Sequence, residues 1–501
     1  MKEYKRRKKC AVCKNKKLHK ILEFGKVPLA GYFPKEEDRD NLSAYELNLK
    51  LCKKCGLVQT DSVINPDILF KDYRYISSVG LQPHFNELAN ILNDRYNIKE
   101  KKILDIGCND GVLLVPMKKL GADCIGIDPA ENIVQIARGR NLEVINDYFN
   151  IKTAKKYCFK KKFDIITATN TFAHIINIRS ILKGVKYSLK KNGLFIIEVH
   201  YLKRLIEDIQ WDNIYHEHIY YYSLIALNNF SNKIGLKIIN FEEFPIHSGS
   251  IRVTMEKTNK KTPAVIKKQI RKEKEIGLNK VEFFEKFSDK MRKQIIDFKN
   301  LIQGKKIIGY GASGRANMFC NIVGLSSKDI LFIIDESPER YGRYIANTDI
   351  PIYPKEKLES ENKEDIYILI LAWNYQDMII DKLKKIGFVN YIIAFPEPII
   401  KKYYKMKILI LGHNGLLGNM VYLYFKSSNY EIITTDLRWP DDDFKLFVSE
   451  HRADYIINCV GMIPQKKPDN KLYDLINYQL PVWLDELGIK IIHPDTDEPD
   501  D

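Results

Sequence analysis

Four consecutive side chains with acid–base chemistry, Tyr215-His216-Glu217-His218, stand near the middle of the sequence. The histidine imidazole titrates near neutral pH and is a common general base, and carboxylates can take the same role. If the run is extended, alternate side chains share a side, so that Tyr215 lies with Glu217 and His216 with His218. The residue types leave three interpretations open: proton removal in catalysis, a buried polar cluster with a structural role, or a metal site. The spacing differs from the His-Glu-x-x-His of zinc proteases.

Two cysteine pairs near the N-terminus could supply four thiolates to one metal ion, since each Cys-x-x-Cys turn presents two sulfurs. They are Cys10 with Cys13 and Cys52 with Cys55. We expect a structural zinc site, because four sulfurs leave no open coordination position. The gap between the pairs exceeds the simplest ribbon pattern, but loop closure entropy grows slowly with length. Four unrelated thiols or a redox pair is the alternative. The other cysteines are dispersed, which predicts no disulfide framework.

A glycine-containing turn follows the expected strand KILDIG, residues 102–107, and opens a helix. Gly107 and Gly111 allow a ligand to approach the backbone, and amides at a helix start can face a carboxylate. Asp128 ends the next expected strand, about 20 residues after the turn, where an acid can hold two ribose hydroxyls. A nucleotide-type cofactor is therefore expected here.

The details of this turn favour S-adenosylmethionine over NAD. The segment from Asp105 through Gly107 and Asn109 to Gly111 resembles the E/D-x-G-x-G-x-G signature of class I methyltransferases and lacks the dinucleotide glycine spacing. The same resemblance implies two further cofactor contacts, Asp147 near the adenine and Asn170 at the tip of the fourth strand. A Rossmann-like unit without cofactor is the alternative.

Short apolar strands alternate with helices from residue 101 onward, which predicts parallel sheets covered on both faces. Residues 256–303 are charged, with apolar residues near helical spacing, and predict an amphipathic helix or helix pair. Further strand–glycine-turn–helix units open at residues 306 and 407. The expected fold class is α/β, a zinc-binding N-terminal domain followed by consecutive Rossmann-like three-layer domains. The expected parts are zinc-binding 1–75, methyltransferase 76–255, helical connector 256–303, Rossmann-like 304–400 and a partial short-chain-dehydrogenase-like domain 406–501.

The formal charge of +16 could serve nucleic acid, anionic small substrates or simply reflect a lysine-rich proteome. The lysines are spread among acidic residues and form no basic recognition helix, so nucleic-acid binding is not expected. Positive potential would help to capture a diphosphate substrate. The sequence contains no apolar run of transmembrane length and no signal peptide, so a cytoplasmic location is expected, with no membrane partner.

Several dispersed segments together resemble the sugar C-methyltransferases of deoxysugar biosynthesis, which methylate C3 of thymidine-diphosphate 4-keto sugars. They cover nearly all of residues 8–400: the cysteine pairs, VPLAGYF, LDIGCNDG, TFAHI, DNIYHEHIYYYS, HSGSIRV, GYGASGRANMF, IDESPERYGRYIANTDIPI and LAWNY. The resemblance implies a zinc-binding lobe, a central methyltransferase lobe, and a Rossmann-like lobe that closes over the sugar nucleotide. It implies a nucleotide-diphosphate keto sugar as substrate and a monomer or weak homodimer.

The resemblance also implies roles for individual residues. His218 or Glu217 would be the base, with Tyr215 and His174 near the sugar, and we expect His218. Enolisation at C3 is assisted by the C4 ketone, and no metal is needed. The expected substrate-binding residues are His247, Gly309, Gly311, Arg315 and Asn317.

Two departures from the family pattern leave the exact sugar open. Ser248 stands where the family usually has glycine, and Arg315 with Ala316 where lysine and glycine are expected. Arginine still suits a phosphate.

A third glycine turn, Gly412-x-x-Gly415-x-x-Gly418, follows the expected strand KILIL, and Asp436 ends the next strand. This part resembles extended short-chain dehydrogenases, in particular dTDP-4-dehydrorhamnose reductase, and could bind NAD(P). The catalytic Tyr-x-x-x-Lys is absent, so a remnant without function is the alternative. Two other functions stay open for the whole chain: a nucleotide-sugar reductase and a nucleic-acid methyltransferase.

Overall fold

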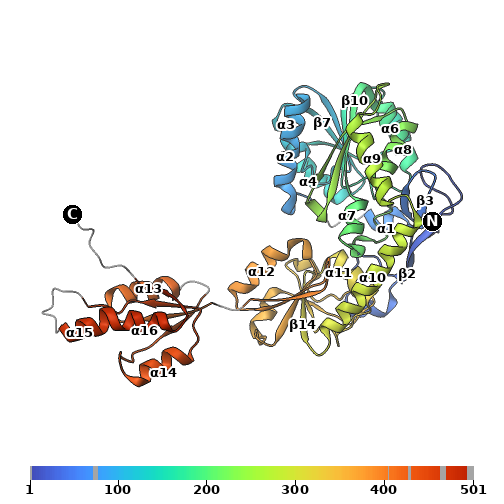
Figure 1. The fold of residues 1–501 in the computed structure, drawn as a ribbon. Coiled ribbons are helices and arrows are strands. Elements are labelled where there is room, and N and C mark those ends of the chain that lie inside the picture. The colour runs from blue at the N-terminus through green and yellow to red at the C-terminus, as the bar shows by residue number, and fades with distance from the viewer. Residues whose placement is uncertain (1–2, 71–76, 404–405, 427–429, 463–469, 494–501) are drawn as a thin grey trace. The chain divides into compact units, whose positions relative to one another are not determined.

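The computed structural model describes residues 3–70, 77–403, 406–426, 430–462 and 470–493 (Figure 1). The chain divides into two compact units. Residues 1–361, 368–376 and 392–399 form the first, and residues 362–367, 377–391 and 400–501 form the second. Among the described residues, no helix combines the length and apolar character that a membrane crossing requires.

The N-terminal lobe of the first unit is built on an antiparallel sheet of order β11-β4-β3-β2. Its strands are β2 (His19–Val27), β3 (Tyr45–Cys52), β4 (Leu57–Thr60) and β11 (Tyr220–Tyr221). A separate pair joins β1 (Tyr4–Arg6) to β5 (Ser62–Ile64), and α1 (Pro66–Phe70) follows. β11 comes from the central part of the chain, directly after the Tyr215–His218 run. This strand pairing therefore ties the reactive run to the N-terminal lobe.

The central lobe holds a seven-stranded sheet of order β12-β13-β10-β9-β6-β7-β8. Five strands are parallel: β6 (Lys102–Ile106), β7 (Asp123–Asp128), β8 (Glu143–Asn146), β9 (Phe163–Thr169) and β10 (Leu189–His200). β13 (Ser250–Glu256) pairs antiparallel with both of its neighbours, β10 and β12 (Lys237–Phe244). The chain runs outward from β6 through β7 and β8, then returns to β9 on its other side. That reversal is the topological switch point where α/β sheets bind ligands.

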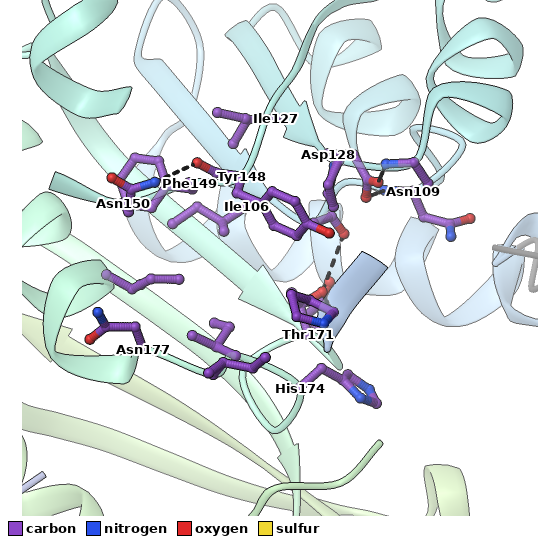
Figure 2. A pocket seen from close by; sticks show the side chains of 18 of the residues that line it. Ile106, Asn109, Ile127, Asp128, Tyr148, Phe149, Asn150, Thr171, His174 and Asn177 are labelled. Carbon is purple, nitrogen blue, oxygen red and sulfur yellow. Dashed lines mark hydrogen bonds between the residues drawn. The ribbon is translucent and has the colours of Figure 1, made fainter. Parts of the chain in front are cut away.

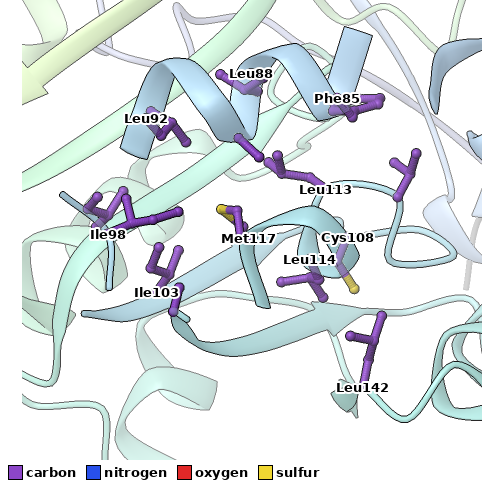
Figure 3. Close-up of a cluster of buried hydrophobic side chains, with 14 of the residues drawn as sticks. Phe85, Leu88, Leu92, Ile98, Ile103, Cys108, Leu113, Leu114, Met117 and Leu142 are labelled. Atoms are coloured by element: carbon purple, nitrogen blue, oxygen red, sulfur yellow. The ribbon is translucent and has the colours of Figure 1, made fainter. Parts of the chain in front are cut away.

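Helices cover both faces of this sheet, with α2 and α3 on one face and α6 and α8 on the other (Figure 1). The helices of this lobe are α2 (Ser78–Tyr96), α3 (Leu114–Lys119), α4 (Glu131–Gly139), α5 (Ile151–Lys156), α6 (Ile178–Ser188), α7 (Leu202–Glu207) and α8 (Leu224–Lys233). Figure 3 shows how α2 buries Phe85, Leu88 and Leu92 against Leu113 and Met117. This packing holds the turn after β6 against a rigid core.

Two helices, α9 (Ala264–Ile276) and α10 (Val281–Ile302), occupy the stretch expected to be a helix pair. They lead into a sheet of order β16-β15-β14-β17-β18-β19. Its strands are β14 (Lys306–Tyr310), β15 (Ile333–Ile334), β16 (Ile352–Tyr353), β17 (Ile366–Ile370), β18 (Asn390–Ile393) and β19 (Ile399–Lys402). Helix α11 (Gly314–Val323) follows β14, and α12 (Gln376–Lys385) follows β17.

The second unit includes a four-stranded parallel sheet of order β21-β20-β22-β23. Its strands are β20 (Lys407–Leu411), β21 (Glu431–Thr434), β22 (Tyr455–Asn458) and β23 (Lys490–Ile492). Its helices are α13 (Leu416–Lys426), α14 (Asp442–Glu450), α15 (Asn470–Asp474) and α16 (Leu480–Glu486). The expected fold class is confirmed: an N-terminal cysteine-bearing lobe is followed by consecutive Rossmann-like α/β parts.

Candidate active site

A hollow of about 320 Å³ opens at the carboxyl ends of β6, β7 and β9 (Figure 2). The loops after these strands supply most of its wall, as the switch point of the sheet requires. The lining residues are Pro66, Ser77, Ile106, Gly107, Asn109, Ile127, Asp128, Pro129, Ala130, Tyr148, Phe149, Asn150, Thr169, Thr171, His174, Ile175, Ile176, Asn177 and Ile181.

Gly107 lines the hollow and has a backbone that other residues rarely adopt, with φ +70°. A Cβ there would lie 2.4 Å from the Thr171 side chain, so only glycine fits. Gly111 also has positive φ, at +80°, but a Cβ would meet Leu142 at 2.1 Å. Gly111 therefore serves the packing of the turn and does not line the hollow.

Asp128 ends β7 at the edge of the hollow. Its carboxylate accepts hydrogen bonds from the backbone N–H groups of Ala130 and Asn109, both at 3.0 Å. Burial raises the pKa of Asp128, and these two hydrogen bonds oppose that shift. The two N–H groups hold the acid facing the hollow, where it could accept from ribose hydroxyls.

Asp105 lies one layer deeper, at the end of β6. It is buried and accepts a hydrogen bond of 2.7 Å from Thr167 Oγ1. Burial raises the pKa of Asp105 to about 7, with a smaller contribution from the negative charges of Asp128 and Glu198. Asp105 is not among the residues that line the hollow.

Asp147 is not among the lining residues, although the sequence resemblance points to it as an adenine contact. Its carboxylate accepts hydrogen bonds from Lys156 Nζ and Tyr157 Oη, both at 3.2 Å. The next residues, Tyr148 and Phe149, line the hollow instead. Their aromatic character beside a strand-end acid is the signal that could have identified them from sequence.

The Tyr215–His218 run forms a turn, in which the His218 N–H donates to Tyr215 O at 3.1 Å. It is therefore not extended, and the expected sharing of sides does not hold. His218 Nδ1 donates to the backbone carbonyl of Asn213 at 3.1 Å, because a carbonyl can only accept. Nε2 of the neutral ring is then an acceptor, and Tyr215 Oη lies 3.0 Å from it.

His174 connects this turn to the large hollow. His174 lines the hollow (Figure 2). The centroid of its ring lies 5.0 Å from that of the His218 ring. His174 Nδ1 donates to the backbone carbonyl of Glu217 at 2.8 Å. Burial lowers the pKa of His174, which keeps this imidazole neutral at neutral pH. The His174 and His218 rings thus lie side by side, with His174 at the wall of the hollow.

Glu217 is half-buried, and burial raises its pKa. Its Oε1 accepts from the backbone N–H of Gly31 at 3.2 Å, in the loop after β2. Its Oε2 is shielded from solvent and has no hydrogen-bond partner among the described residues. An unsatisfied buried carboxyl oxygen beside the histidines is the kind of group that can exchange a proton.

Asn170 lies in a smaller cavity of about 30 Å³, which His218 also lines. Its φ is +54°, and its backbone N–H donates to Glu198 O at 2.9 Å. Its amide Nδ2 is buried with no partner within the described parts of the chain. Asn170 is therefore next to the proposed base, and it does not line the large hollow.

The residues present fit S-adenosylmethionine. A hollow with an acid at the second strand end, a glycine turn at the first and aromatic residues after the third accommodates a ribose, an aminoacyl chain and an adenine.

Four cysteine sulfurs gather at one point of the N-terminal lobe. The Sγ atoms of Cys10, Cys13, Cys52 and Cys55 all lie within 4.8 Å of one another. Cys10 Sγ is 3.5 Å from Cys55 Sγ, and Cys13 Sγ is 3.4 Å from Cys52 Sγ. Four ligands at about 2.3 Å from a tetrahedral zinc would be about 3.8 Å apart, so the cluster fits zinc. Asn15 Nδ2 also donates to Cys52 Sγ at 3.7 Å.

The expected substrate residues of the third lobe have other neighbours. Gly309 and Gly311 belong to β14 and its turn, where a Cβ would meet Ile333 and Ala372, both at 2.7 Å. The side chain of His247 lies outside the described residues. Asn317 is fully buried, and its Nδ2 donates to three backbone carbonyls of the loop after β2: Leu29, Ala30 and Tyr32. Arg315 is paired with Asp212.

In the second unit, the turn after β20 brings its glycines together. Gly412 has φ +74°, and a Cβ on Gly418 would lie 2.0 Å from Gly412 O. Gly415 N–H donates to Gly412 O at 3.0 Å. The Asp436 side chain is 82% exposed and accepts from Asn414 Nδ2 at 2.7 Å. The NAD(P) site stays a prediction.

Three family models match successive parts of the chain. The family described as "Putative zinc binding domain" matches residues 10–70, a methyltransferase domain matches residues 82–240, and a C-methyltransferase C-terminal domain matches residues 245–396. All three matches end before residue 406, where the last expected domain begins.

Two relatives and one solved structure add to these matches. C-methyltransferase NovU from Streptomyces niveus is 29% identical over 404 residues, 78% of this chain and 96% of NovU. Ubiquinone biosynthesis O-methyltransferase from Glaesserella parasuis serovar 5 is 36% identical over 114 residues, 21% of this chain and 48% of that enzyme. Magnesium protoporphyrin IX methyltransferase from Synechocystis PCC 6803 aligns with a TM-score of 0.28 at 16% identity, over 36% of this chain and 81% of that one.

Proposed function

We propose that the chain is an S-adenosylmethionine-dependent C-methyltransferase that methylates a carbon beside the ketone of a nucleotide-linked sugar. The three family matches and the similarity to C-methyltransferase NovU over 404 residues support this proposal. The proposed position is C3 of a 4-keto deoxysugar. The segments shared with sugar C-methyltransferases support the substrate class.

One observation carries this proposal. His218 has its Nδ1 committed to a backbone carbonyl, and its ring lies 5.0 Å from His174 at the rim of the large hollow. A fixed tautomer directs the basic Nε2 away from the Asn213 carbonyl and toward Tyr215. A ring protonated at Nδ1 leaves Nε2 as the basic nitrogen, which is what removal of a carbon-bound proton by a histidine requires.

The residues proposed to hold the methyl donor are those of the large hollow and its floor. Asp128 would accept from ribose hydroxyls, Gly107 would let the ligand reach the backbone, and Tyr148 and Phe149 would contact the adenine. The charge of Asp105 would favour a cationic ligand. When bound, S-adenosylmethionine supplies an activated methyl group on a sulfonium centre.

The proposed reaction assigns one proton to one atom. His218 Nε2 takes the proton from C3, the C–H electrons move into an enolate, and the negative charge gathers on the C4 oxygen. Once His218 Nε2 carries the proton, the Tyr215 hydroxyl is free to donate a hydrogen bond to that oxygen. The enolate carbon would then form its new carbon–carbon bond to the methyl group that the bound donor supplies, with the donor's thioether as the leaving group. Glu217 would receive the proton afterwards.

Two assays test the proposal in sequence. First, the protein is incubated in D₂O with thymidine-diphosphate 4-keto sugars and no methyl donor. We expect deuterium at C3, and His218→Ala should abolish the exchange. Second, S-adenosylmethionine is added, and mass spectrometry should find a 4-keto product heavier by one methyl group. Methylation of RNA together with inert keto sugars would overturn the proposal and favour the nucleic-acid alternative.

A further inference from the structure

The first turn of α11 contacts the segment just before the Tyr215–His218 turn through a buried ion pair between Arg315 and Asp212. Arg315 Nε lies 2.8 Å from Asp212 Oδ2, and Nη2 lies 3.1 Å from Oδ1, so the pair is bidentate. The side chains are only 14% and 1% exposed. The third nitrogen, Nη1, donates to Ser248 Oγ at 3.2 Å. All three guanidinium nitrogens of Arg315 therefore donate hydrogen bonds to other residues of the protein.

Trp373 completes the enclosure of this ion pair. The Arg315 guanidinium carbon lies 4.3 Å from the centroid of the Trp373 ring, and Trp373 Nε1 donates to Asp212 Oδ2 at 2.9 Å. Asp212 thus accepts three hydrogen bonds from the third lobe. A bidentate pair fixes orientation as well as distance, so the backbone at residue 212 is held in one direction.

The next residue of the chain is the one that orients the proposed base. Asp212 lies in the 3₁₀ helix η2 (Trp211–Asn213), and the Asn213 carbonyl accepts from His218 Nδ1 at 3.1 Å. Trp211 adds a second anchor, because its buried ring stacks on Phe319 of α11 at 5.4 Å and 13°. Residues of α11 therefore contact two adjacent side chains of η2, Trp211 and Asp212. These directly precede Asn213, whose carbonyl accepts from His218 Nδ1.

We propose that Arg315 is a positioning residue for His218, acting through Asp212 and the Asn213 carbonyl, and not a ligand of the substrate phosphates. The inference rests on the proposed function, in which His218 Nε2 removes the proton. With the ion pair in place, the Asn213 carbonyl faces Nδ1 and leaves Nε2 basic. Without it, η2 can turn, and either ring nitrogen can carry the proton.

The same turn of α11 reaches the second proposed acid–base group by a separate route. The Asn317 amide holds three carbonyls of residues 29–32, and the Gly31 N–H of that loop donates to Glu217 Oε1 at 3.2 Å. A Cβ on Gly314 would lie 3.3 Å from Ala30 O, so the loop and the helix are in close contact. The first turn of α11 therefore contacts the segments that hold both His218 and Glu217.

The tautomer of His218 can be measured in the full chain without any substrate. The chain contains ten histidines, and ¹⁵N-histidine labelling with long-range ¹H–¹⁵N spectra distinguishes the two tautomers of each ring. His218→Gln assigns the signal. We expect the wild-type ring to be protonated at Nδ1, and Arg315→Met to convert it to a mixture or to the Nε2 form. Lys190→Met is the control, because it breaks a 2.8 Å ion pair with Asp164 at the amino end of β9 and β10.

Kinetics with the keto sugar nucleotide separate positioning from substrate binding. For Arg315→Met we expect kcat to fall about 10- to 100-fold, as misplacement of a base by about 1 Å would cause, with KM within about twofold of wild type. Arg315→Lys should be intermediate, since lysine offers charge without the paired N–H groups. Should Arg315→Met fail to fold, Asp212→Asn is measured in the same two assays.

The outcomes are distinct. A wild-type His218 protonated at Nε2, or an unchanged tautomer in a folded Arg315→Met or Asp212→Asn, overturns the inference. So does a tenfold rise in KM with kcat unchanged, which would make Arg315 a substrate ligand. If the wild type methylates no keto sugar, the proposed function fails, but the tautomer comparison still decides whether Arg315 positions His218.

Discussion

At the residue scale, His216 and His218 lie in different surroundings, which give the two imidazoles different roles. His216 is buried, its Nε2 lies 3.3 Å from Glu46 O, and burial lowers its pKa to about 4. It is a neutral structural residue at physiological pH. His218 instead lies between Tyr215 and His174, next to both cavities. One turn thus supplies a packing histidine and a proposed base.

We predict that His218→Ala slows methyl transfer by a factor of about 10²–10⁴, the usual contribution of a general base. Glu217→Gln should also slow turnover, because the amide cannot receive a proton. Neither residue lines the large hollow, so S-adenosylmethionine affinity measured by calorimetry should stay within about twofold of wild type. If both variants turn over at the wild-type rate, the assigned site is wrong.

Asp105 predicts a pH dependence of stability. Its pKa is raised to about 7 in the folded chain, so between about pH 4 and pH 7 the folded state holds a proton that the unfolded state has released. This contribution to stability is therefore lost as pH rises toward 7. Asp105→Asn removes this pH dependence. The free energy of unfolding of the variant, relative to that of wild type, should therefore rise by about 2 kcal/mol from pH 5 to pH 8. Denaturant unfolding of both proteins at pH 5 and pH 8 measures these free energies. The same difference between variant and wild type at both pH values would contradict the prediction.

The two positions where the sequence departs from the family pattern contact one another. Ser248 has φ +67°, a conformation that favours glycine, and its Oγ accepts from Arg315 Nη1 at 3.2 Å. The cost of the strained backbone is offset in part by a hydrogen bond that glycine could not make. A serine and an arginine at these positions therefore form one matched pair.

At the element scale, the backbone of the turn after β6 lines the hollow at Gly107 and is closely packed against the Thr171 side chain. Gly107 is held by its N–H bond of 2.8 Å to Ile127 O and by the Thr171 side chain at its Cα. The rigid core beneath α2 and α3 supports this turn (Figure 3). Its shape is therefore preset before a ligand arrives.

We predict that Gly107→Ala reduces S-adenosylmethionine affinity at least tenfold, because the added Cβ meets Thr171 at 2.4 Å and the backbone has positive φ. Gly25→Ala is the matched control, since its φ is +74° but nothing lies within 4 Å of the new Cβ. It should cost about 1 kcal/mol of stability and leave affinity unchanged. Equal affinities for the two variants would argue against a ligand at this turn.

The two cysteine turns before β2 and between β3 and β4 are expected to depend on their metal. Cys10→Ser replaces one thiolate, so zinc measured by elemental analysis should fall well below one per chain, with a lower Tm. The control is Cys158→Ser, which changes an exposed cysteine outside the cluster. Retained stoichiometric zinc in Cys10→Ser would exclude the predicted ligand set.

At the scale of the whole molecule, the family matches end shortly before the last sheet of the chain begins. The matches end at residue 396, and the four-stranded sheet of the second unit begins at Lys407. Every residue proposed for methyl transfer belongs to the first unit. The four-stranded sheet is therefore expected to be dispensable for that reaction.

We predict that a chain ending at Tyr403, which retains all six strands of the third sheet, keeps kcat and KM for methyl transfer within about threefold of the full chain. NAD(P) binding, if the full chain has it, should be lost with residues 406–501. Steady-state kinetics and nucleotide titration of both chains measure the two effects. A folded, truncated chain without methyl transfer would show that the last domain takes part in the reaction.

The sequence by itself determined the parts of the site that depend on local spacing. The four zinc ligands, the turn around Gly107 and the strand-end Asp128 follow from spacings that a short stretch of backbone imposes wherever it folds. The order of strands and helices from residue 101 onward was equally readable, because burial on both faces selects continuous apolar strands.

Only the tertiary structure decided which distant residues meet. His174 and His218 become neighbours because the Ile219 N–H donates to Ala173 O at 2.9 Å, and Arg315 reaches Asp212 across 103 residues of chain. Local spacing also could not say that Asp147 turns toward Lys156 while Tyr148 lines the hollow. These contacts depend on how the lobes pack against one another, a property of the folded surfaces and not of any short segment.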